Sequence, residues 1–277
     1  MSTLESAIDR HYGAEDISTR ILRALSGAGQ DVEALTRADL APFDEFHGGG
    51  IASTRELARF ADLAPASHVL DIGCGIGGPA RTLAAEFGCS VVGVDLTHEF
   101  IRAARMLTAR LSMDAQCSFE HGSATTLLFA DASFDLVWSQ NMLMNVPDKA
   151  QLFDEVARVL KPGGRFALET VLTGDGRAIH LPAFWASRPD LSFLVTRREL
   201  ERLLLHAGLE VVAIADTTAA VIANGRSRRA ALAAQDPRQL TIKVIVPDDV
   251  ETKIDNMLRN NQQGRTITIK ALFARRA

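Results

Sequence analysis

From residue 67 onward, short apolar runs alternate with longer segments in which apolar residues recur every three or four positions. A short apolar run is typical of a buried strand, and the longer periodicity is typical of an amphipathic helix. We expect strands at residues 68–73, 90–96, 117–124, 133–141, 165–172, 210–218 and 265–276. We expect the helices between them at residues 79–88, 98–112, 149–161 and 197–209.

This alternation of strands and helices predicts the fold class. Strands that alternate with helices at such spacing form a parallel sheet covered by helices on both faces. The last segment, 265–276, alternates apolar and polar residues, and we expect an antiparallel strand there. The prediction is an α/β protein with a doubly wound, mostly parallel, seven-stranded sheet.

Three segments lie outside the alternation. Residues 1–62 are predicted to form an N-terminal helical lid, and residues 63–277 the main domain. The connection 173–196 is too long for a plain turn and is rich in aromatic residues and proline, so we expect a functional lid there. Residues 220–265 are predicted to be a helical extension, with one helix starting near Pro247 and ending at Gly264.

The amino-acid composition argues against nucleic acid, a metal ion or a membrane as a partner. The 277 residues are 47% hydrophobic and carry a net charge of −4, and no basic stripe of the kind that binds nucleic acid dominates. The one basic cluster, Arg226 to Arg229, indicates a solvated helix face. Three scattered cysteines lack metal-binding spacing, so we expect no metal. With no signal core and no run of about 20 apolar residues, we expect a cytoplasmic protein without membrane contact.

The first predicted strand leads into a glycine loop. Gly73, Gly75 and Gly78 fit the pattern G-x-G-x-x-G, and Asp95 ends the second strand 22 residues after Gly73. Such glycines let the backbone approach a ligand, and such a carboxylate accepts both hydroxyls of a ribose. This part of the pattern fits any adenosine cofactor, and it also fits a tight turn with close helix packing.

Asp71 distinguishes between these cofactors. A pyrophosphate is already negative and is disfavoured beside a carboxylate. A ligand with a sulfonium and an ammonium group is favoured there, which describes S-adenosylmethionine. The alternative for Asp71 is a carboxylate that caps the following loop.

Four motifs carry a resemblance to a known family. "VLDIGCGIGG", "VVGVDL", "FDLVWSQNMLMNVPD" and "VLKPGGRF" resemble, in order and spacing, the class I S-adenosylmethionine-dependent methyltransferases, which have a Rossmann-like fold. The lead-in "FDEFHGGG" and the segment "FWASRPDLSFLVTRREL" are similar to the small-molecule branch that includes sarcosine and dimethylglycine N-methyltransferases. The resemblance implies methyl transfer to a small molecule, most often on nitrogen, with oxygen or carbon as alternatives, and S-adenosylhomocysteine as product.

The resemblance also implies the cofactor contacts. Gly73 and its neighbours would line the methionine end, Asp95 would bind the ribose, and Leu96 would pack on adenine. Ser123 stands where relatives often place an acid facing the adenine amino group. The implied cofactor-binding residues are Asp71, Gly73, Gly75, Gly77, Asp95, Leu96, Ser123, Ala124, Gln140 and Asn141.

Candidates for catalysis are fewer. Relatives often carry aspartate and histidine where this chain has Asn141 and Asn145, so an obvious general base is missing. Asn145 is kept as a catalytic candidate, with a helix cap as its alternative role. His47, flanked by glycine on one side, is the best candidate base, and Glu169 is a polar group at the site edge or a strand-end residue.

Aromatic residues gather in the two predicted lid segments. They could stack on a flat ring or form a cation–π cage over a quaternising amine. The predicted pocket residues are Tyr12, Phe43, Phe46, Phe184, Trp185 and Phe193.

Other function classes remain open at this point. A nicotinamide-dependent oxidoreductase would need a hydride-transfer site such as Tyr-x-x-x-Lys, and Tyr12 is the only tyrosine. A non-catalytic cofactor-binding protein and a cyclopropane-forming enzyme on lipids are further alternatives. We expect a monomer or homodimer acting on a small-molecule acceptor.

Overall fold

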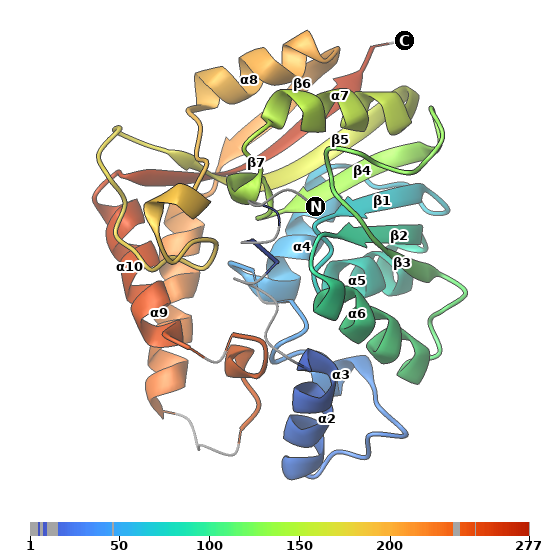
Figure 1. Cartoon of the computed structure of the whole chain (residues 1–277), viewed down its shortest axis with the longest axis vertical. Coiled ribbons are helices and arrows are strands. Elements are labelled where there is room, and N and C mark those ends of the chain that lie inside the picture. The colour runs from blue at the N-terminus through green and yellow to red at the C-terminus, as the bar shows by residue number, and fades with distance from the viewer. Residues whose placement is uncertain are drawn as a thin grey trace.

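The computed structural model describes residues 5, 8–9, 16–45, 47–234, 239–246 and 248–276. Across these residues runs a seven-stranded sheet of order β3-β2-β1-β4-β5-β7-β6 (Figure 1). Its strands are β1 (His68–Ile72), β2 (Ser90–Asp95), β3 (Cys117–His121), β4 (Phe134–Gln140), β5 (Leu160–Thr173), β6 (Leu209–Asp216) and β7 (Thr266–Arg275). The predicted doubly wound sheet is confirmed.

The strand directions follow the prediction. β1 lies between β2 and β4, and both pairings are parallel. β7 inserts between β5 and β6 and is antiparallel to both. Because strand order reverses at β1, the loops after β1 and β4 diverge and leave a crevice at the carboxyl edge, where α/β sheets bind ligands.

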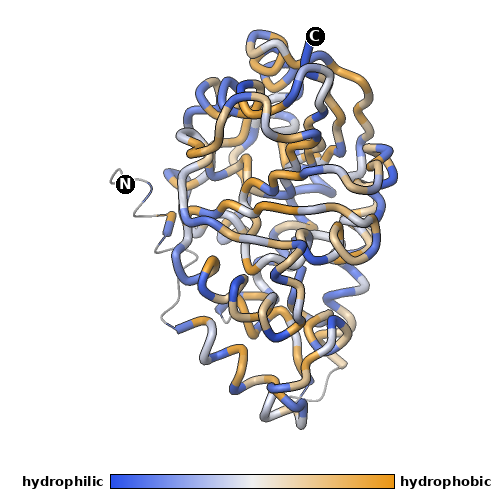
Figure 2. Tube along the Cα trace, turned by 90° about the vertical axis from the view of Figure 1, so that its right-hand side faces the viewer, coloured by the Kyte–Doolittle hydropathy of each residue, from blue (hydrophilic) through white to orange (hydrophobic). Residues whose placement is uncertain are grey.

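Helices cover both faces of the sheet. One buried cluster packs α4, α5 and α6 on the sheet through side chains such as Leu57, Leu83 and Ile101. The opposite cluster packs α7 and α8 through Phe153 and Leu204. In Figure 2 the strands crossing the interior are largely hydrophobic, and hydrophilic positions lie mainly at the outline. The helices are α2 (Ile17–Gly27), α3 (Arg37–Leu40), α4 (Gly50–Phe60), α5 (Gly78–Phe87), α6 (His98–Arg110), α7 (Lys149–Val159), α8 (Arg197–His206), α9 (Thr218–Ala234) and α10 (Val250–Gln262).

The helices α9 and α10 lie side by side, away from the sheet's two helical layers (Figure 1). A Cβ on Gly225 would lie 2.7 Å from Met257 Cε, so a glycine at this point lets the two helices approach closely. The connection 173–196 is mostly irregular, with one short 3₁₀ turn, η2 (Pro189–Leu191). Two further 3₁₀ turns are η1 (Leu143–Asn145) and η3 (Ile242–Val244).

Some element boundaries differ from the prediction. The helix expected over 149–161 ends at Val159, and the next strand begins at Leu160 instead of Arg165. Leu160 has extended backbone and pairs with Phe134, and the register with β4 then shifts before Arg165. The segment "PGG" is thus an irregularity inside β5, and α10 begins at Val250 instead of near Pro247. Within the described ranges, no helix is long and apolar enough to cross a bilayer.

Candidate active site

A cavity of about 930 Å³ opens at the carboxyl edge of the sheet. Its floor is formed by Asp44, Glu45 and residues 47–49, by residues at or after the carboxyl ends of β1 to β4, and by the middle of β5. Residues of α9 and α10, the residues Ile245, Val246 and Asp248, and the 173–196 loop complete its walls. We call these two sides the floor and the roof. Because the two sides come from distant parts of the chain, the cavity encloses a ligand from both.

The glycine loop shapes the floor. Gly73 has φ +78°, and a Cβ there would lie 2.5 Å from Met142 Cβ, so only glycine fits without displacement. The Gly75 N–H donates to Asp95 Oδ2 at 2.9 Å. Gly77, predicted to touch the cofactor, is not among the cavity-lining residues, because it precedes α5 with φ +85° and its side-chain space is filled by Phe119 and Arg81.

Asp71 lies at the base of the floor. Its side chain is buried, and its Oδ2 has no hydrogen-bond partner among the described residues. Burial, and then the charges of Asp95 and Glu45, raise the pKa of Asp71 well above its usual value. A cation beside it would relieve all three effects, so this carboxyl suits a positively charged ligand. A carboxyl that caps the following loop accepts hydrogen bonds from its backbone N–H groups, and no described group donates to Oδ2. The capping alternative therefore gives no role to Oδ2.

Asp95 faces the cavity from the end of β2. Its Oδ1 accepts from the Thr97 N–H at 2.8 Å, and Oδ2 accepts from the Gly75 N–H. These bonds fix the orientation of the carboxylate and leave acceptor capacity for a diol. Burial raises the pKa of Asp95, opposed by the two N–H bonds. Leu96, Ser123 and Ala124 line the cavity nearby, and the Ser123 hydroxyl lies 3.0 Å from that of Thr125.

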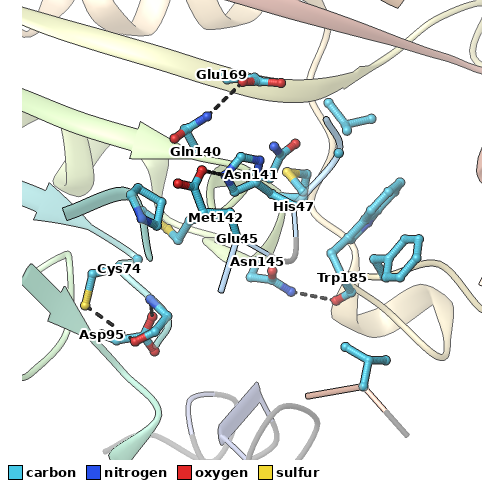
Figure 3. A pocket seen from close by; sticks show the side chains of 18 of the residues that line it. Glu45, His47, Cys74, Asp95, Gln140, Asn141, Met142, Asn145, Glu169 and Trp185 are labelled. Carbon is cyan, nitrogen blue, oxygen red and sulfur yellow. Dashed lines mark hydrogen bonds and ion pairs between the residues drawn. The ribbon is translucent and has the colours of Figure 1, made fainter. Parts of the chain in front are cut away.

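Gln140 joins a buried polar network. Figure 3 shows Gln140 beside Glu169. Gln140 Oε1 accepts from Trp138 Nε1 at 3.0 Å, and the Thr54 hydroxyl lies 2.9 Å from the same oxygen. Its Nε2 donates to Glu169 Oε2 at 3.0 Å, and the Ser53 hydroxyl donates to the same oxygen at 2.6 Å. The network fixes Gln140 and Glu169 at the floor. Glu169 is therefore held by side chains of α4 and β4.

The two asparagines have different surroundings. Asn141 has φ +55°, a left-handed conformation that asparagine tolerates, and its N–H donates to Glu169 O at 2.7 Å. Its buried Nδ2 has no partner among the described residues. Asn145 Nδ2 donates to Trp185 O at 2.7 Å, which ties η1 to the 173–196 loop. The cap of α7 is Asp148, whose side chain accepts from the Gln151 N–H, so the helix-cap alternative for Asn145 is wrong.

His47 lines the cavity beside an acid that sequence reasoning missed. His47 Nε2 lies 3.3 Å from Glu45 Oε2 and 3.3 Å from the Thr54 hydroxyl (Figure 3). Burial acts to raise the pKa of Glu45, but the His47 contact and the Thr54 and Thr82 hydroxyls hold it below its usual value. Glu45 is therefore an anion that fixes the imidazole. Its only sequence signal was its place two residues before His47.

The predicted aromatic pocket is only partly assembled. Phe184 and Trp185 line the cavity. Phe43 is instead fully buried with Ile17, Ile21 and other side chains of the N-terminal helices. Phe193 is half-buried outside the cavity lining, with its N–H bonded to Met144 O. Tyr12 and Phe46 lie outside the described residues.

Two cations on the roof were also missed. Arg228 and Lys253 line the cavity, although the cluster around Arg228 had been predicted as a solvated face. That prediction fits exposed Arg226 but is wrong for Arg228. Which side of a helix faces inward depends on the packing of α9 on α10, and the weakly amphipathic sequence of α9 gave little signal for it.

Comparisons with known proteins agree with this geometry. Residues 70–168 match the family described as "Methyltransferase domain". The chain is 34% identical over 134 residues to Methyltransferase GfsG of Streptomyces halstedii, covering 48% of each protein. It is 31% identical over 178 residues to phosphoethanolamine N-methyltransferase 3 of Arabidopsis thaliana, covering 61% of this chain and 34% of that protein. The chain thus spans half or less of the length of these curated relatives.

A solved structure extends the likeness of fold. A putative sarcosine dimethylglycine methyltransferase from Galdieria sulphuraria superposes with a TM-score of 0.69 at 21% identity, covering 82% of this chain and 85% of that one. At this identity the similarity concerns the fold alone. The resemblance expected from the four sequence motifs is confirmed, and residues 70–168 are a methyltransferase domain.

Proposed function

Since residues 70–168 form a methyltransferase domain, we propose that the whole protein transfers a methyl group from S-adenosylmethionine to a small-molecule acceptor, preferentially on nitrogen. The observation that carries the proposal is the buried Asp71 carboxyl, with Oδ2 unpartnered, on the same floor as the Asp95 carboxylate. Asp71 suits a cationic centre, and Asp95 suits a ribose. This combination favours a sulfonium cofactor over a dinucleotide, whose pyrophosphate Asp71 would repel.

Each predicted cofactor contact has a role in this proposal. Asp95 would accept the ribose hydroxyls, while Leu96, Ser123 and Ala124 would line the adenine. Gly73 and Gly75 would allow the methionine end to approach the backbone. Gln140 and Asn141 would bound the sulfonium side of the cavity, and Gly77 would contribute only by directing the loop into α5.

The chemistry then needs alignment more than covalent help. When bound, S-adenosylmethionine supplies a methyl group already activated by its sulfonium. The acceptor nitrogen donates its lone pair to the methyl carbon, the carbon–sulfur bond breaks, and its electron pair stays on sulfur. The cavity walls hold the two partners in line and exclude water. A proton carried by the amine leaves to a nearby base or to solvent.

Side chains on both sides of the cavity suit an acceptor that becomes cationic. Glu45 and Glu169 are acids at the cavity wall, and Trp185 and Phe184 offer aromatic faces. His47, fixed by Glu45, is the proposed base for an acceptor that must lose a proton. Asn145 would act as a positioning residue, because its amide holds the backbone of Trp185.

Ligand binding tests the proposal directly. We expect S-adenosylmethionine and S-adenosylhomocysteine to raise the melting temperature, since a ligand at about 100 times its Kd adds roughly 2.7 kcal/mol. NAD should leave it unchanged. Methyl transfer is then assayed on amines, azaheterocycles and phenols. Stabilisation by NAD alone would favour an oxidoreductase, and binding of the first two with no turnover on any acceptor would favour a non-catalytic role.

A further inference from the structure

Arg228 is a cation inside the cavity wall, and no carboxylate among the described residues forms an ion pair with it. Burial lowers the pKa of its guanidinium, with no carboxylate opposing the effect. Its hydrogen bond among the described residues is a long one, from Nη1 to His47 O at 3.4 Å. A guanidinium has five N–H donors, and burying it unpaired is unfavourable. Most of its donors are therefore free for a ligand.

Lys253 approaches the same cavity from α10. Its side chain is only 9% exposed, and burial lowers the pKa of its amine. Within the described residues its Nζ forms no hydrogen bond or ion pair, although the exposed Asp248 and Asp249 oppose the shift from a distance. Lys253 is thus a second cation at the roof that no described residue neutralises by contact.

The packing of α9 on α10 sets both cations on the same side of the cavity. Gly225 faces Met257 and Leu258, and one turn later Arg229 forms an ion pair with Asp255 at 3.1 Å. The two helices are therefore antiparallel. This register places Arg228 on the stretch of α9 that faces the first turns of α10, where Lys253 also lies.

Charge on the cavity wall is unevenly distributed. The floor carries the acids Asp44, Glu45, Asp71, Asp95, Asp148 and Glu169, whereas Arg228 and Lys253 belong to the roof. The roof also includes one exposed acid, Asp248, at its rim. The acidic floor favours a cationic or polar group of a ligand, and the cationic roof favours an anionic group.

We propose that Arg228 and Lys253 form an anion subsite for the acceptor, so that the methylated molecule carries a carboxylate or phosphate. A guanidinium matches both anions with paired N–H donors, and an ammonium adds a compact charge. This inference rests on the proposed function, because it names the acceptor class for the same cavity. Arg228 contacts the His47 backbone, so the subsite adjoins the proposed base.

The test uses Arg228→Gln and Lys253→Gln, with Arg226→Gln as the matched control. Arg226 lies on the same helix, is exposed and does not line the cavity. Inorganic phosphate is titrated calorimetrically into protein saturated with S-adenosylhomocysteine and into protein without it. We expect phosphate affinity to fall about tenfold or more in each roof variant and to stay unchanged in Arg226→Gln. The phosphate affinity of Arg228→Lys should lie between that of Arg228→Gln and that of the wild type.

Two readouts separate the subsite from other roles. Removing an unpaired buried charge should leave the melting temperature of Arg228→Gln equal or higher, whereas a structural arginine would give a lower one. S-adenosylhomocysteine and its decarboxylated analogue should each bind Arg228→Gln as well as they bind the wild type. A loss confined to the form with a carboxylate would mean that Arg228 binds the cofactor, and would overturn the acceptor assignment.

The remaining outcomes are equally decisive. Phosphate that does not bind the wild type, or that binds Arg228→Gln and Lys253→Gln unchanged, overturns the subsite. Failure of S-adenosylhomocysteine to bind would instead remove the proposed function. In that case the phosphate titration without it still reports on Arg228 and Lys253 alone.

Discussion

The floor and the roof of the cavity are built in different ways. The floor comes from consecutive strand ends, and its acids are held by backbone N–H groups and a buried side-chain network. The roof comes mainly from α9, α10 and an irregular loop, and its two cations have almost no partners in the part of the chain that the structure describes. A fixed, acidic floor suits the proposed cofactor, which is the same molecule whichever acceptor is methylated. A roof with unneutralised cations suits recognition of one particular acceptor.

Of the variants considered, Asp95→Ala should show the largest difference between floor and roof, because it weakens cofactor binding and a roof variant does not. Removing a carboxylate that accepts two ribose hydroxyls should weaken S-adenosylhomocysteine binding by about 3 kcal/mol, or roughly 100-fold. Calorimetric titration measures the change, and Asp95→Asn, which keeps one acceptor oxygen, should lose less. Arg228→Gln serves as the roof control. Equal affinity in Asp95→Ala and the wild type would refute the ribose role.

Gly73→Ala should show how tightly the floor is packed. Its φ of +78° is unfavourable for alanine, and the new Cβ would lie 2.5 Å from Met142 Cβ. Backbone strain and overpacking together should lower the free energy of unfolding by about 3 kcal/mol. Chemical denaturation measures this loss.

Gly176→Ala is the matched control in the 173–196 loop. Its φ is +83°, and nothing lies within 4 Å of the added Cβ. It should lose only the conformational part, about 1 kcal/mol. If both variants lost the same amount, the contact with Met142 would carry no cost, and the floor would be more adaptable than its geometry indicates.

The same contrast explains what the sequence could predict. The floor depends on short-range patterns: a strand, a glycine turn at Gly73, and an acid such as Asp95 at the end of the next strand. Local geometry dictates these residue types, so motif and spacing identified them. The mostly parallel sheet followed from the alternation of strands and helices, and the antiparallel β7 followed from its alternating residues.

The roof could not be predicted in the same way. Arg226 and Arg228 are two residues apart, yet one faces solvent and the other the cavity, and only packing on α10 decides which. Phe43 was predicted in the pocket because it is an aromatic residue of the predicted N-terminal lid segment, but the core of the N-terminal helices buries it. Glu45 was overlooked because its partners, Thr54 and Thr82, come from other elements.

The pH dependence of binding should differ in sign between floor and roof. The raised pKa of Asp71 means that the folded, unliganded protein keeps this carboxyl protonated above the pH at which an unfolded chain, with a pKa of about 3.9, releases the proton. A sulfonium ligand favours the carboxylate, so its binding releases a proton. S-adenosylmethionine affinity should therefore rise with increasing pH until Asp71 ionises without ligand.

At the roof the sign is reversed. Burial lowers the pKa of Lys253 below 10.5, so its charge is lost as pH rises through that lowered value. Phosphate binds the charged amine, and its affinity for the roof should fall over this alkaline range. Titrations of each ligand across pH, with Asp71→Asn and Lys253→Gln, measure the two slopes. Asp71→Asn should flatten only the cofactor profile, and Lys253→Gln only the alkaline part of the phosphate profile. Slopes of the same sign in the wild type would mean that floor and roof do not divide the ligands by charge.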